Sequence, residues 1–465
     1  MPGIVICIHI FGEYLDFHPN LHALVTDGLF TRDGRFHVMP VVNLKPLEYL
    51  FQARVIGFVV ILTFHPVFAI LTTMTSLLET GSGMISAYAG RCQPKSDFLS
   101  LFDEYKHFEH KFPEPQYLGA KNRLLPWIAQ HIPAEVKTAI DAFAGSQSVA
   151  FFFKQSGFRT VSNDFLSFNN QIGKALIENR SVHLDEADVA MLFSPSPDKT
   201  KFSLMEEQFS NVFFEFDEAR FLDNFRANVE SLDNPFKRAL AFAVMSRSLT
   251  RKITMGHFAH TQALVYSANP DRIKRNRSLV RPVKDIFTEI LPSYNAAVFD
   301  NGQDNTSNCA NILDILPTFP QADLIYFDPP YCDSHADYQG FYHLLETFVE
   351  YWRDKRFVNG IRRYEPQRFS GFDKKTDVLA SFGKLGELSA DIPHWILSYN
   401  NRSYPGIDEL KQILSKHRNV RVEAKTYLSG RGGKGSVAGS KEIIFVCSPK
   451  TAVFMPPLTA GREDV

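Results

Sequence analysis

The sequence is poor in cysteine, and its cysteines form no pattern. The 465 residues include five, spread along the chain as Cys7, Cys92, Cys309, Cys332 and Cys447. No two of them make a CxxC pair or a metal-ligand spacing, so a zinc ribbon and a disulfide framework are excluded. Scattered cysteines of this kind suit a reducing compartment, and we expect a cytoplasmic protein.

The sequence also lacks a net charge and the common cofactor loops. Fifty Lys and Arg balance 51 Asp and Glu, so any surface for nucleic acid must come from local asymmetry. The segment GRGGKGS at 430–436 lacks the GxxxxGK[ST] order of a Walker loop, and we interpret it as a hairpin loop that could touch DNA. None of the 15 histidines lies in a metal-ligand cluster or beside a serine nucleophile with an acid partner. We therefore expect no metal site.

A long apolar stretch lies near the amino terminus. Residues 55–78 contain no Asp, Glu, Lys or Arg, and 24 residues are long enough to cross a bilayer. His65 and Pro66 interrupt this stretch, threonines dilute its second half, and no aromatic belt or basic cluster flanks it. We favour an apolar junction over a membrane span. A signal peptide is not expected, because no cationic start and no A-x-A site are present.

From about residue 112 the sequence alternates short apolar strands with helices. This alternation predicts an α/β fold, a doubly wound and mostly parallel sheet with helices on both faces. Such sheets bind ligands at the carboxyl ends of their strands. We expect strands in the segments 138–145, 158–164, 322–331, 394–400, 421–428 and 441–447, and a helix in 148–157.

About 160 residues separate the second and third of these strand segments, which is too many for a loop and predicts an inserted, mainly helical region. Its charges are segregated: residues 182–233 hold 12 acids and four bases, whereas 234–284 hold 11 bases and one acid. A basic run can be only a solvated face. Cations without partners repel one another, however, so contact with the phosphates of DNA is the alternative that we favour. The candidate DNA-binding residues are Arg251, Lys252, Arg272, Lys274, Arg275, Arg277 and Arg281.

The tetrapeptide Asp328-Pro329-Pro330-Tyr331 follows the apolar segment LIYF. In the simplest interpretation the two prolines only end a strand and fix an extended turn. A chemical interpretation explains all four residues. The amino group on an aromatic base is a poor nucleophile, because its lone pair is delocalised into the ring. The Asp328 carboxylate and the Pro329 carbonyl can each accept one N–H, which frees the lone pair, while the Tyr331 ring stacks on the base.

Three motifs in this order resemble the Dam-like DNA adenine-N6 methyltransferases. The segment YLGAK at 117–121, followed by NRLL, resembles the family's N-terminal cofactor motif. DAFAGS at 141–146 resembles the glycine-containing loop after its first strand, and Asp-Pro-Pro-Tyr comes last, which is the family's alpha order. The resemblance covers about residues 112–450. It implies a Rossmann-like fold, S-adenosylmethionine as the cofactor, and an adenine flipped out of duplex DNA as the substrate.

The resemblance also implies a set of cofactor-binding residues. Gly145 would let the backbone approach the methionine part of the cofactor, Asp164 would accept bonds from the ribose, and Lys121 would pair with the cofactor's carboxylate. Asp304 resembles the family's third-strand acid, with Asp300 as a competitor. Gln147 stands where the family often has a second glycine. The expected cofactor-binding residues are Tyr117, Lys121, Asp141, Phe143, Gly145, Asp164, Asp304 and Asp328.

The first 52 residues resemble a fragment of the rolling-circle transposases. In that family two histidines around one hydrophobic residue hold a divalent cation. Here the pattern is Asn20-Leu21-His22, so one ligand is replaced by asparagine, and no segment resembles the family's tyrosine helix. We interpret this region as a fused remnant without transposase activity.

These observations predict an organisation and leave alternative functions open. The expected divisions are a transposase-like remnant (1–52), an apolar junction (53–111), a cofactor-binding half (112–181), a target-recognition insertion (182–295), a catalytic half (296–450) and a tail (451–465). We expect a monomer that binds double-stranded DNA in a restriction-modification or mobile-element setting, with a cognate nuclease as a candidate partner. An amino-methyltransferase acting on cytosine N4, RNA or a protein amide is one alternative. A DNA-binding remnant without enzyme activity is the other.

Overall fold

The computed structural model describes residues 4–10, 19–25, 28–30, 36–38, 108–195, 202–253, 256–259, 263–332, 337–358, 363–365, 369–426 and 441–450. The chain divides into two compact units, Met1–Lys95 and Ser96–Val465. The apolar stretch at 55–78, the glycine-rich segment at 430–436 and the tail at 451–465 lie outside the described residues. Within the described ranges, no helix has both the length and the apolar character that a membrane span needs.

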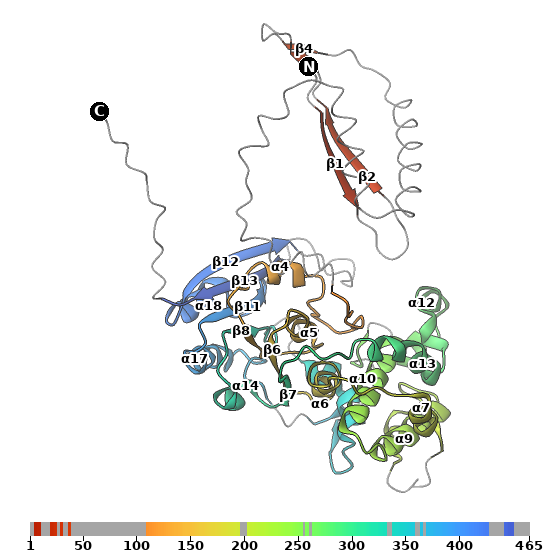
Figure 1. Ribbon diagram of the computed structural model, residues 1–465. Coiled ribbons are helices and arrows are strands. Elements are labelled where there is room, and N and C mark those ends of the chain that lie inside the picture. Colours follow the sequence, from red (N-terminus) through yellow and green to blue (C-terminus); the bar gives the residue numbers. More distant parts are fainter. Residues whose placement is uncertain are drawn as a thin grey trace, which may run out of the picture. The chain divides into compact units, whose positions relative to one another are not determined.

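The first unit contains two short antiparallel strand pairs (Figure 1). Strand β1 (Ile4–Ile10) pairs with β2 (Pro19–Val25), and β3 (Gly28–Phe30) pairs with β4 (Phe36–Val38). The Asn20-Leu21-His22 pattern lies within β2.

The second unit is built on a seven-stranded sheet of order β12-β13-β11-β8-β5-β6-β7. Five strands run parallel: β5 (Thr138–Asp141), β6 (Arg159–Asp164), β7 (Thr306–Cys309), β8 (Leu324–Phe327) and β11 (His394–Asn400). Strand β13 (Lys441–Ser448) runs antiparallel to β11, and β12 (Asn419–Thr426) runs antiparallel to β13. The predicted α/β class with a mostly parallel sheet is confirmed.

Helices cover both faces of this sheet because alternate strand residues face opposite sides. Ile325 and Phe327 of β8 pack with α14 (Ile312–Ile315), α17 (Val378–Leu388) and α18 (Ile407–Ser415). Leu324 and Tyr326 of the same strand pack with α4 (Leu125–Ala129) and α5 (Ser148–Gln155) on the other face. Figure 1 shows both helical layers around the sheet.

The helical region between β6 and β7 shares one core with its neighbours. Phe151 of α5 belongs to this core, whereas Phe152 and Phe153 pack against the sheet, so α5 joins the two layers. The longest helix of the region, α10, contacts α6, and both lie in this core with α16 (His343–Glu350). The helices of the region are α6 (Ser167–Gly173), α7 (Glu186–Phe193), α8 (Leu204–Phe209), α9 (Phe216–Glu230), α10 (Pro235–Lys252), α11 (Ala263–Ser267), α12 (Pro270–Arg275) and α13 (Val283–Asn295).

A buried lysine on α5 ties this helix to the end of a π-helical turn at Lys174–Glu178. Lys154 is fully buried, and its ammonium donates to the carbonyls of Leu176 (2.9 Å) and Asn179 (2.8 Å). Burial lowers the pKa of Lys154 from 10.5 to about 7, although the charge of Asp300 opposes this shift. The folded chain therefore holds this proton less tightly than the unfolded chain does.

We predict that Lys154→Met weakens the pH dependence of stability above neutral pH. Between pH 7 and 10.5 the unfolded wild-type chain binds a proton at Lys154 that the folded chain has released. The free energy of unfolding therefore gains up to about 1.4 kcal/mol per pH unit from this group, and the variant lacks that gain. Urea unfolding at pH 7, 8 and 9 measures it, with Lys384→Met, an exposed position on α17, as the control. Equal slopes in wild type and Lys154→Met would contradict the prediction.

Candidate active site at the carboxyl edge of the sheet

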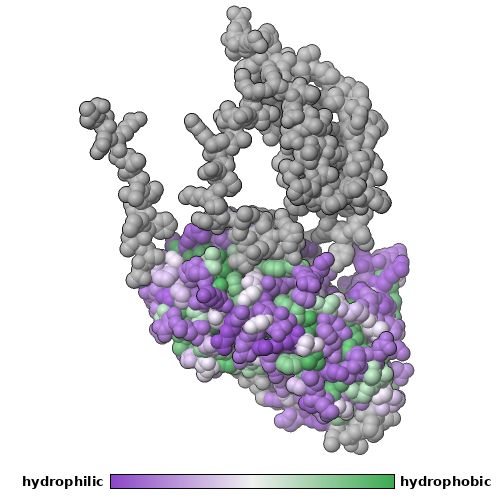
Figure 2. Space-filling view, in the orientation of Figure 1, coloured by the Kyte–Doolittle hydropathy of each residue, from purple (hydrophilic) through white to green (hydrophobic). Residues whose placement is uncertain are grey.

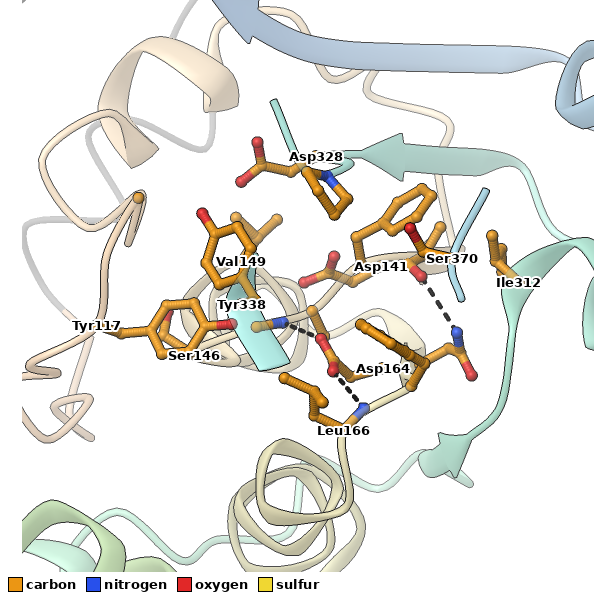
Figure 3. Close-up of a pocket in the computed structure, with 18 of the residues that line it drawn as sticks. Tyr117, Asp141, Ser146, Val149, Asp164, Leu166, Ile312, Asp328, Tyr338 and Ser370 are labelled. Carbon is orange, nitrogen blue, oxygen red and sulfur yellow. Dashed lines mark hydrogen bonds between the residues drawn. The ribbon is translucent and has the colours of Figure 1, made fainter. Parts of the chain in front are cut away.

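A cavity of about 720 Å³ opens where β5, β6, β7 and β8 end (Figure 3). Its wall contains the residues that directly follow these strands, including Ala142 after β5, Phe165 after β6, Ala310 after β7 and Asp328 after β8. Parallel strands thus bring four separate segments of the sequence to one edge, as expected for a doubly wound sheet.

A tight turn after β5 shapes the floor of the cavity. Gly145 adopts a φ of +46°, and a Cβ at this position would lie 3.0 Å from Cε1 of Tyr117, so only glycine fits without strain. The Gly145 amide donates to Oδ2 of Asp164 at 2.9 Å, and the Ala144 amide donates to the Asn163 carbonyl at 2.9 Å. The turn is therefore fixed to the end of the neighbouring strand β6.

Gln147 completes this turn in place of a second glycine. It adopts a φ of 68°, in the left-handed region that costs a non-glycine residue roughly 1–2 kcal/mol. Its side chain is fully buried, and its amide nitrogen donates to the Asn169 carbonyl at 3.2 Å. The departure from the family pattern therefore leaves the loop tight, and the bond to Asn169 offsets part of the strain.

Asp164 links the glycine turn to the start of α6. Its Oδ1 accepts hydrogen bonds from the Leu166 amide (2.8 Å) and from the Asn169 side chain (3.1 Å), while Oδ2 accepts from Gly145. Burial raises the pKa of Asp164, and these donors act against that shift. The carboxylate thus has a fixed orientation at the cavity wall (Figure 3).

Asp141 presents a carboxylate oxygen that lacks a partner. Its Oδ2 accepts from the Ala150 amide of α5 at 3.0 Å, whereas Oδ1 is buried without a hydrogen-bond partner among the described residues. Burial raises the pKa of Asp141 well above its usual range, and the charge of Asp328 raises it further. Asp141, Asp164 and Asp328 line the cavity together with a single ammonium, that of Lys121. This excess of acid favours a ligand that carries positive charge.

Four largely buried polar groups form a network beside the cavity. The Lys121 ammonium lies 2.9 Å from Oδ2 of Asp328 and 3.3 Å from Oε1 of Glu442. The Tyr331 hydroxyl lies between the two acids, 3.0 Å from Oδ1 of Asp328 and 2.9 Å from Oε1 of Glu442. The side chains of Lys121, Asp328 and Glu442 are only 6%, 18% and 10% exposed. Two carboxylates thus share one ammonium and one hydroxyl.

Burial and charge act in opposite directions within this network. Burial raises the pKa of Asp328, the Lys121 ammonium lowers it, and the nearby Glu442 raises it again, with a net increase. Burial alone would lower the pKa of Lys121, but Asp328, Tyr331 and Glu442 more than reverse this effect and hold it well above its usual range. Lys121 therefore carries a charge that holds the two acids together.

The structure places most of the predicted cofactor residues around the cavity. Tyr117, Lys121, Asp141, Phe143, Gly145, Asp164 and Asp328 all line it. The Tyr117 ring stacks on Tyr342 at 4.7 Å and on Tyr338 at 5.6 Å, and Tyr338 also lines the cavity. The Lys121 ammonium, predicted to pair with a ligand carboxylate, bonds to Asp328 and Glu442 in this structure.

The Asp-Pro-Pro-Tyr segment lies directly after β8, and its four residues have different surroundings. Asp328 and Pro330 line the cavity, whereas Pro329 is buried. The Tyr331 ring is not among the lining residues and meets Tyr399 edge-on at 5.0 Å. The structure thus shows the Tyr331 hydroxyl in a polar network and its ring packed on β11.

Asp304 does not belong to this site. Its side chain is 79% exposed and pairs with Arg180 at 3.2 Å. The reason is the position of the third strand, since β7 is Thr306–Cys309 and Asp304 precedes it. An acid before a parallel strand lies at the amino edge of the sheet, opposite the ligand edge. The residues after β7, namely Ala310, Asn311 and Ile312, line the cavity instead.

Some of the predicted DNA-binding residues of the insertion form ion pairs with acids. Arg251 and Arg281 both pair with Glu289, and Lys252 pairs with Glu218 at 3.1 Å. The expectation of uncompensated cations is thus wrong for these three, because α9 and α13 bring acids from elsewhere in the sequence against α10.

The exposed cations of this region gather around α12. Lys274, Arg275 and Arg277 are exposed there, and Arg272 lies over the Tyr266 ring at 4.5 Å. Lys274 has only a long contact of 3.8 Å with Asp271, in which both side chains are exposed. Hydrophilic residues cover this corner of the molecule in Figure 2.

Glu442 is the residue of the network that the sequence prediction missed. It is the second residue of β13, and it lies opposite Asn400, the last residue of β11. An antiparallel strand brings its first residues to the edge where the parallel strands end. A signal was present in the sequence, because the hairpin loop expected at 430–436 implies that the final strand runs antiparallel to the strand before it.

Comparisons with known proteins match both units of the chain. The family model described as D12 class N6 adenine-specific DNA methyltransferase matches residues 117–412. The chain is 33% identical over 343 residues to the Type II methyltransferase M2.HphI of Haemophilus parahaemolyticus, covering 72% of this chain and 98% of that relative.

More distant relatives are longer than this chain. Modification methylase LlaI of Lactococcus lactis subsp. lactis is 24% identical over 75% of this chain and 57% of its own length. Type II methyltransferase M.FokI of Planomicrobium okeanokoites is 24% identical over 65% of this chain and 47% of its own. The chain thus spans about half the length of these two relatives. A transposase family model matches residues 3–59.

We predict that Lys121→Met destabilises the fold in a pH-dependent manner. Without the ammonium, two buried carboxylates repel each other, and breaking such a buried pair costs about 3 kcal/mol or more. The loss in the free energy of unfolding is expected to be large at pH 8 and smaller at pH 5.5, because Asp328, whose pKa is raised, takes up a proton as the pH falls. Urea unfolding of wild type and variant at the two pH values measures this. An equal loss at both pH values would show that the ion network does not cause the destabilisation.

Proposed function

The chain belongs to the D12 class N6 adenine-specific DNA methyltransferase family, and we propose that it transfers the methyl group of S-adenosylmethionine to N6 of a flipped-out adenine at a specific site in duplex DNA. The single observation that carries this proposal is the position of Asp328. Its carboxylate lies at the wall of an acid-rich cavity that also contains the glycine turn. An acceptor for an amino group and a site for a cationic cofactor thus adjoin each other.

The residues around the cavity fit S-adenosylmethionine. The unpartnered Oδ1 of Asp141 is suited to the cofactor's ammonium, and Asp164 to its ribose hydroxyls. The first turn of α5, whose residues Ser148 and Val149 line the cavity, offers amide donors to a carboxylate. When bound, the cofactor supplies an electrophilic methyl group on a sulfonium, whose charge the three cavity acids favour.

Catalysis by the Asp-Pro-Pro-Tyr segment is mainly positioning. Asp328 accepts one N–H of the adenine amino group and the Pro329 carbonyl accepts the other, which localises the lone pair on nitrogen. The two prolines hold both acceptors in place. Pro330 and Tyr338, which line the cavity, supply apolar contact area for the base. These contacts would hold the amino nitrogen beside the cofactor, which would supply its sulfonium methyl group.

The exposed cations of the insertion fit the DNA backbone. An adenine in a duplex must leave the stack before its amino group can reach Asp328, at a cost of a few kcal/mol. Phosphate contacts by Arg272, Lys274, Arg275 and Arg277 offset this cost and hold the duplex over the cavity. Arg251, Lys252 and Arg281 instead support this surface through their ion pairs with α9 and α13.

The relatives suggest the biological setting. Their names identify them as Type II methyltransferases and modification methylases. By analogy the chain serves as the modification enzyme of a restriction-modification system, with a cognate nuclease as its partner, and it acts as a monomer in the cytoplasm. The amino-terminal unit, with asparagine in place of one histidine of the metal motif, contributes no transposase activity.

Expression of the full chain in a host without DNA methylation tests the proposed function. We expect N6-methyladenine at one short recognition sequence throughout the host genome, detected by single-molecule sequencing. Asp328→Ala is expected to abolish the modification, because it removes the acceptor that activates the amino group, while the variant still folds and binds S-adenosylmethionine. The exposed substitution Lys384→Ala is the matched control. An unmodified genome with wild-type chain, or an equally modified one with Asp328→Ala, would refute the proposal.

The double variant Arg275→Ala/Arg277→Ala tests the DNA surface. We expect weaker binding to duplexes of any sequence, and a plot of log affinity against log salt whose slope falls by about 1 for each phosphate that the variant no longer neutralises. Fluorescence anisotropy at several salt concentrations measures this. The variant Lys384→Ala/Lys411→Ala removes two exposed cations from α17 and α18 and serves as the control. An unchanged salt slope would place the DNA elsewhere.

A further inference from the structure

A hydroxyl group connects the proposed catalytic acid to a second acid on another strand. The Tyr331 hydroxyl lies 3.0 Å from Asp328 and 2.9 Å from Glu442, within hydrogen-bond distance of both. Glu442 lies on β13, beyond the residues 117–412 that match the family model. Hydrogen bonding on both sides of one hydroxyl is the geometry that a proton relay requires.

Transfer of a methyl group to an amino group creates a proton that must leave. Adenine N6 has two hydrogens before the reaction and retains one afterwards. The base and the cofactor would displace water from the cavity, so a side chain of its wall is the nearest acceptor for this proton. Asp328 is the acid beside the amino group, and it lines that cavity. The Tyr331 hydroxyl, 3.0 Å from Asp328, offers a route that leads away from the cavity.

We propose that Glu442 is the final acceptor of the proton released from N6, which reaches it through Asp328 and the Tyr331 hydroxyl. This inference rests on the proposed function. Glu442 does not line the cavity, and its side chain keeps one-tenth of its surface exposed, so it can pass the proton to solvent while the cavity is filled.

Atoms and electrons balance at every step of the methyl transfer and the relay. The N6–CH3 bond forms as the S–CH3 bond breaks, and the electron pair of the broken bond stays on sulfur. In the same transition state the nitrogen gives one proton to the Asp328 carboxylate, so that N6 does not build up a full positive charge. Asp328 passes a proton to the Tyr331 oxygen as the hydroxyl proton of Tyr331 moves to Glu442, which restores Asp328 and Tyr331. Glu442 then loses its proton to water, and no oxidant, reductant or metal is needed.

The surroundings of Glu442 suit a temporary proton acceptor. Its Oε1 faces the Lys121 ammonium at 3.3 Å, the Tyr331 hydroxyl, and the Ser398 hydroxyl of β11 at 3.2 Å. Among titratable groups, Asp328 and Tyr338 also interact with its charge. The Lys121 ammonium lowers the pKa of Asp328, which favours the release of its proton to the Tyr331 oxygen.

A purely structural role for Glu442 makes a different prediction. If Glu442 only held Tyr331 and Lys121 in position, glutamine would suffice, because its carbonyl oxygen has the same size and accepts the same hydrogen bonds. Glutamine cannot take up a proton. The comparison of Glu442→Gln with Glu442→Ala therefore separates the two roles.

The test uses the full chain, labelled S-adenosylmethionine and a duplex containing the recognition site, with enzyme in excess over DNA. If the relay operates, Glu442→Gln and Glu442→Ala both lower the single-turnover rate at pH 8 by roughly 100-fold, the lower end of the effect of general acid–base groups. Affinity for cofactor and DNA stays unchanged. Glu387→Gln, an exposed position on α17, is the control.

Two further results complete the test. Tyr331→Phe is expected to match the loss in Glu442→Gln, and the double variant to be no slower than either single variant, because both interrupt one route. Wild-type activity in Glu442→Gln would overturn the relay while leaving the methyltransferase assignment intact. A wild-type chain that transfers no methyl group would remove the proposed function and the relay together.

Discussion

The ion pair between Lys121 and Asp328 is the interaction on which the site depends. It joins the loop before α4 to the end of β8 at 2.9 Å, inside a region that water reaches poorly. Two acids, Asp328 and Glu442, are held there by one ammonium, and burial raises the pKa of Asp328 while Lys121 limits this rise. A carboxylate that stays charged despite burial can accept an N–H from a base. The cavity also favours a cationic ligand, because more acidic than basic side chains line it.

The topology of the sheet explains why these groups meet. Parallel strands β5, β6, β7 and β8 all end at one edge, so the glycine turn, Asp164, the residues after β7 and Asp328 gather there from across the sequence. The reversed strand β13 brings Glu442 to the same edge from the opposite direction. A fully parallel sheet would place the start of its last strand at the far edge and leave Tyr331 without its second acid.

The bounds of most strands could be predicted from the local pattern of residues in the sequence. Strand β11 has the predicted bounds 394–400, and β6, β8, β12 and β13 lie inside their expected segments or within two residues of them. Strands β8, β11 and β13 are mostly buried apolar runs, whereas β12 is largely exposed. The polar segment TSNC of β7 gave no such signal, which is why Asp304 was assigned to the wrong edge. The ion pairs of Arg251, Lys252 and Arg281 depend on acids that other helices carry, which composition alone cannot place. The family itself was predicted correctly, since three short motifs in order are specific in combination.

The identity of the modified atom tests this account most directly. Purified full chain is incubated with S-adenosylmethionine carrying an isotope-labelled methyl group and with duplex DNA containing its recognition site, and the DNA is digested to nucleosides for mass spectrometry. The account predicts that the label appears in N6-methyldeoxyadenosine. Label in N4-methyldeoxycytidine, or in no nucleoside while the protein binds the cofactor, would contradict it.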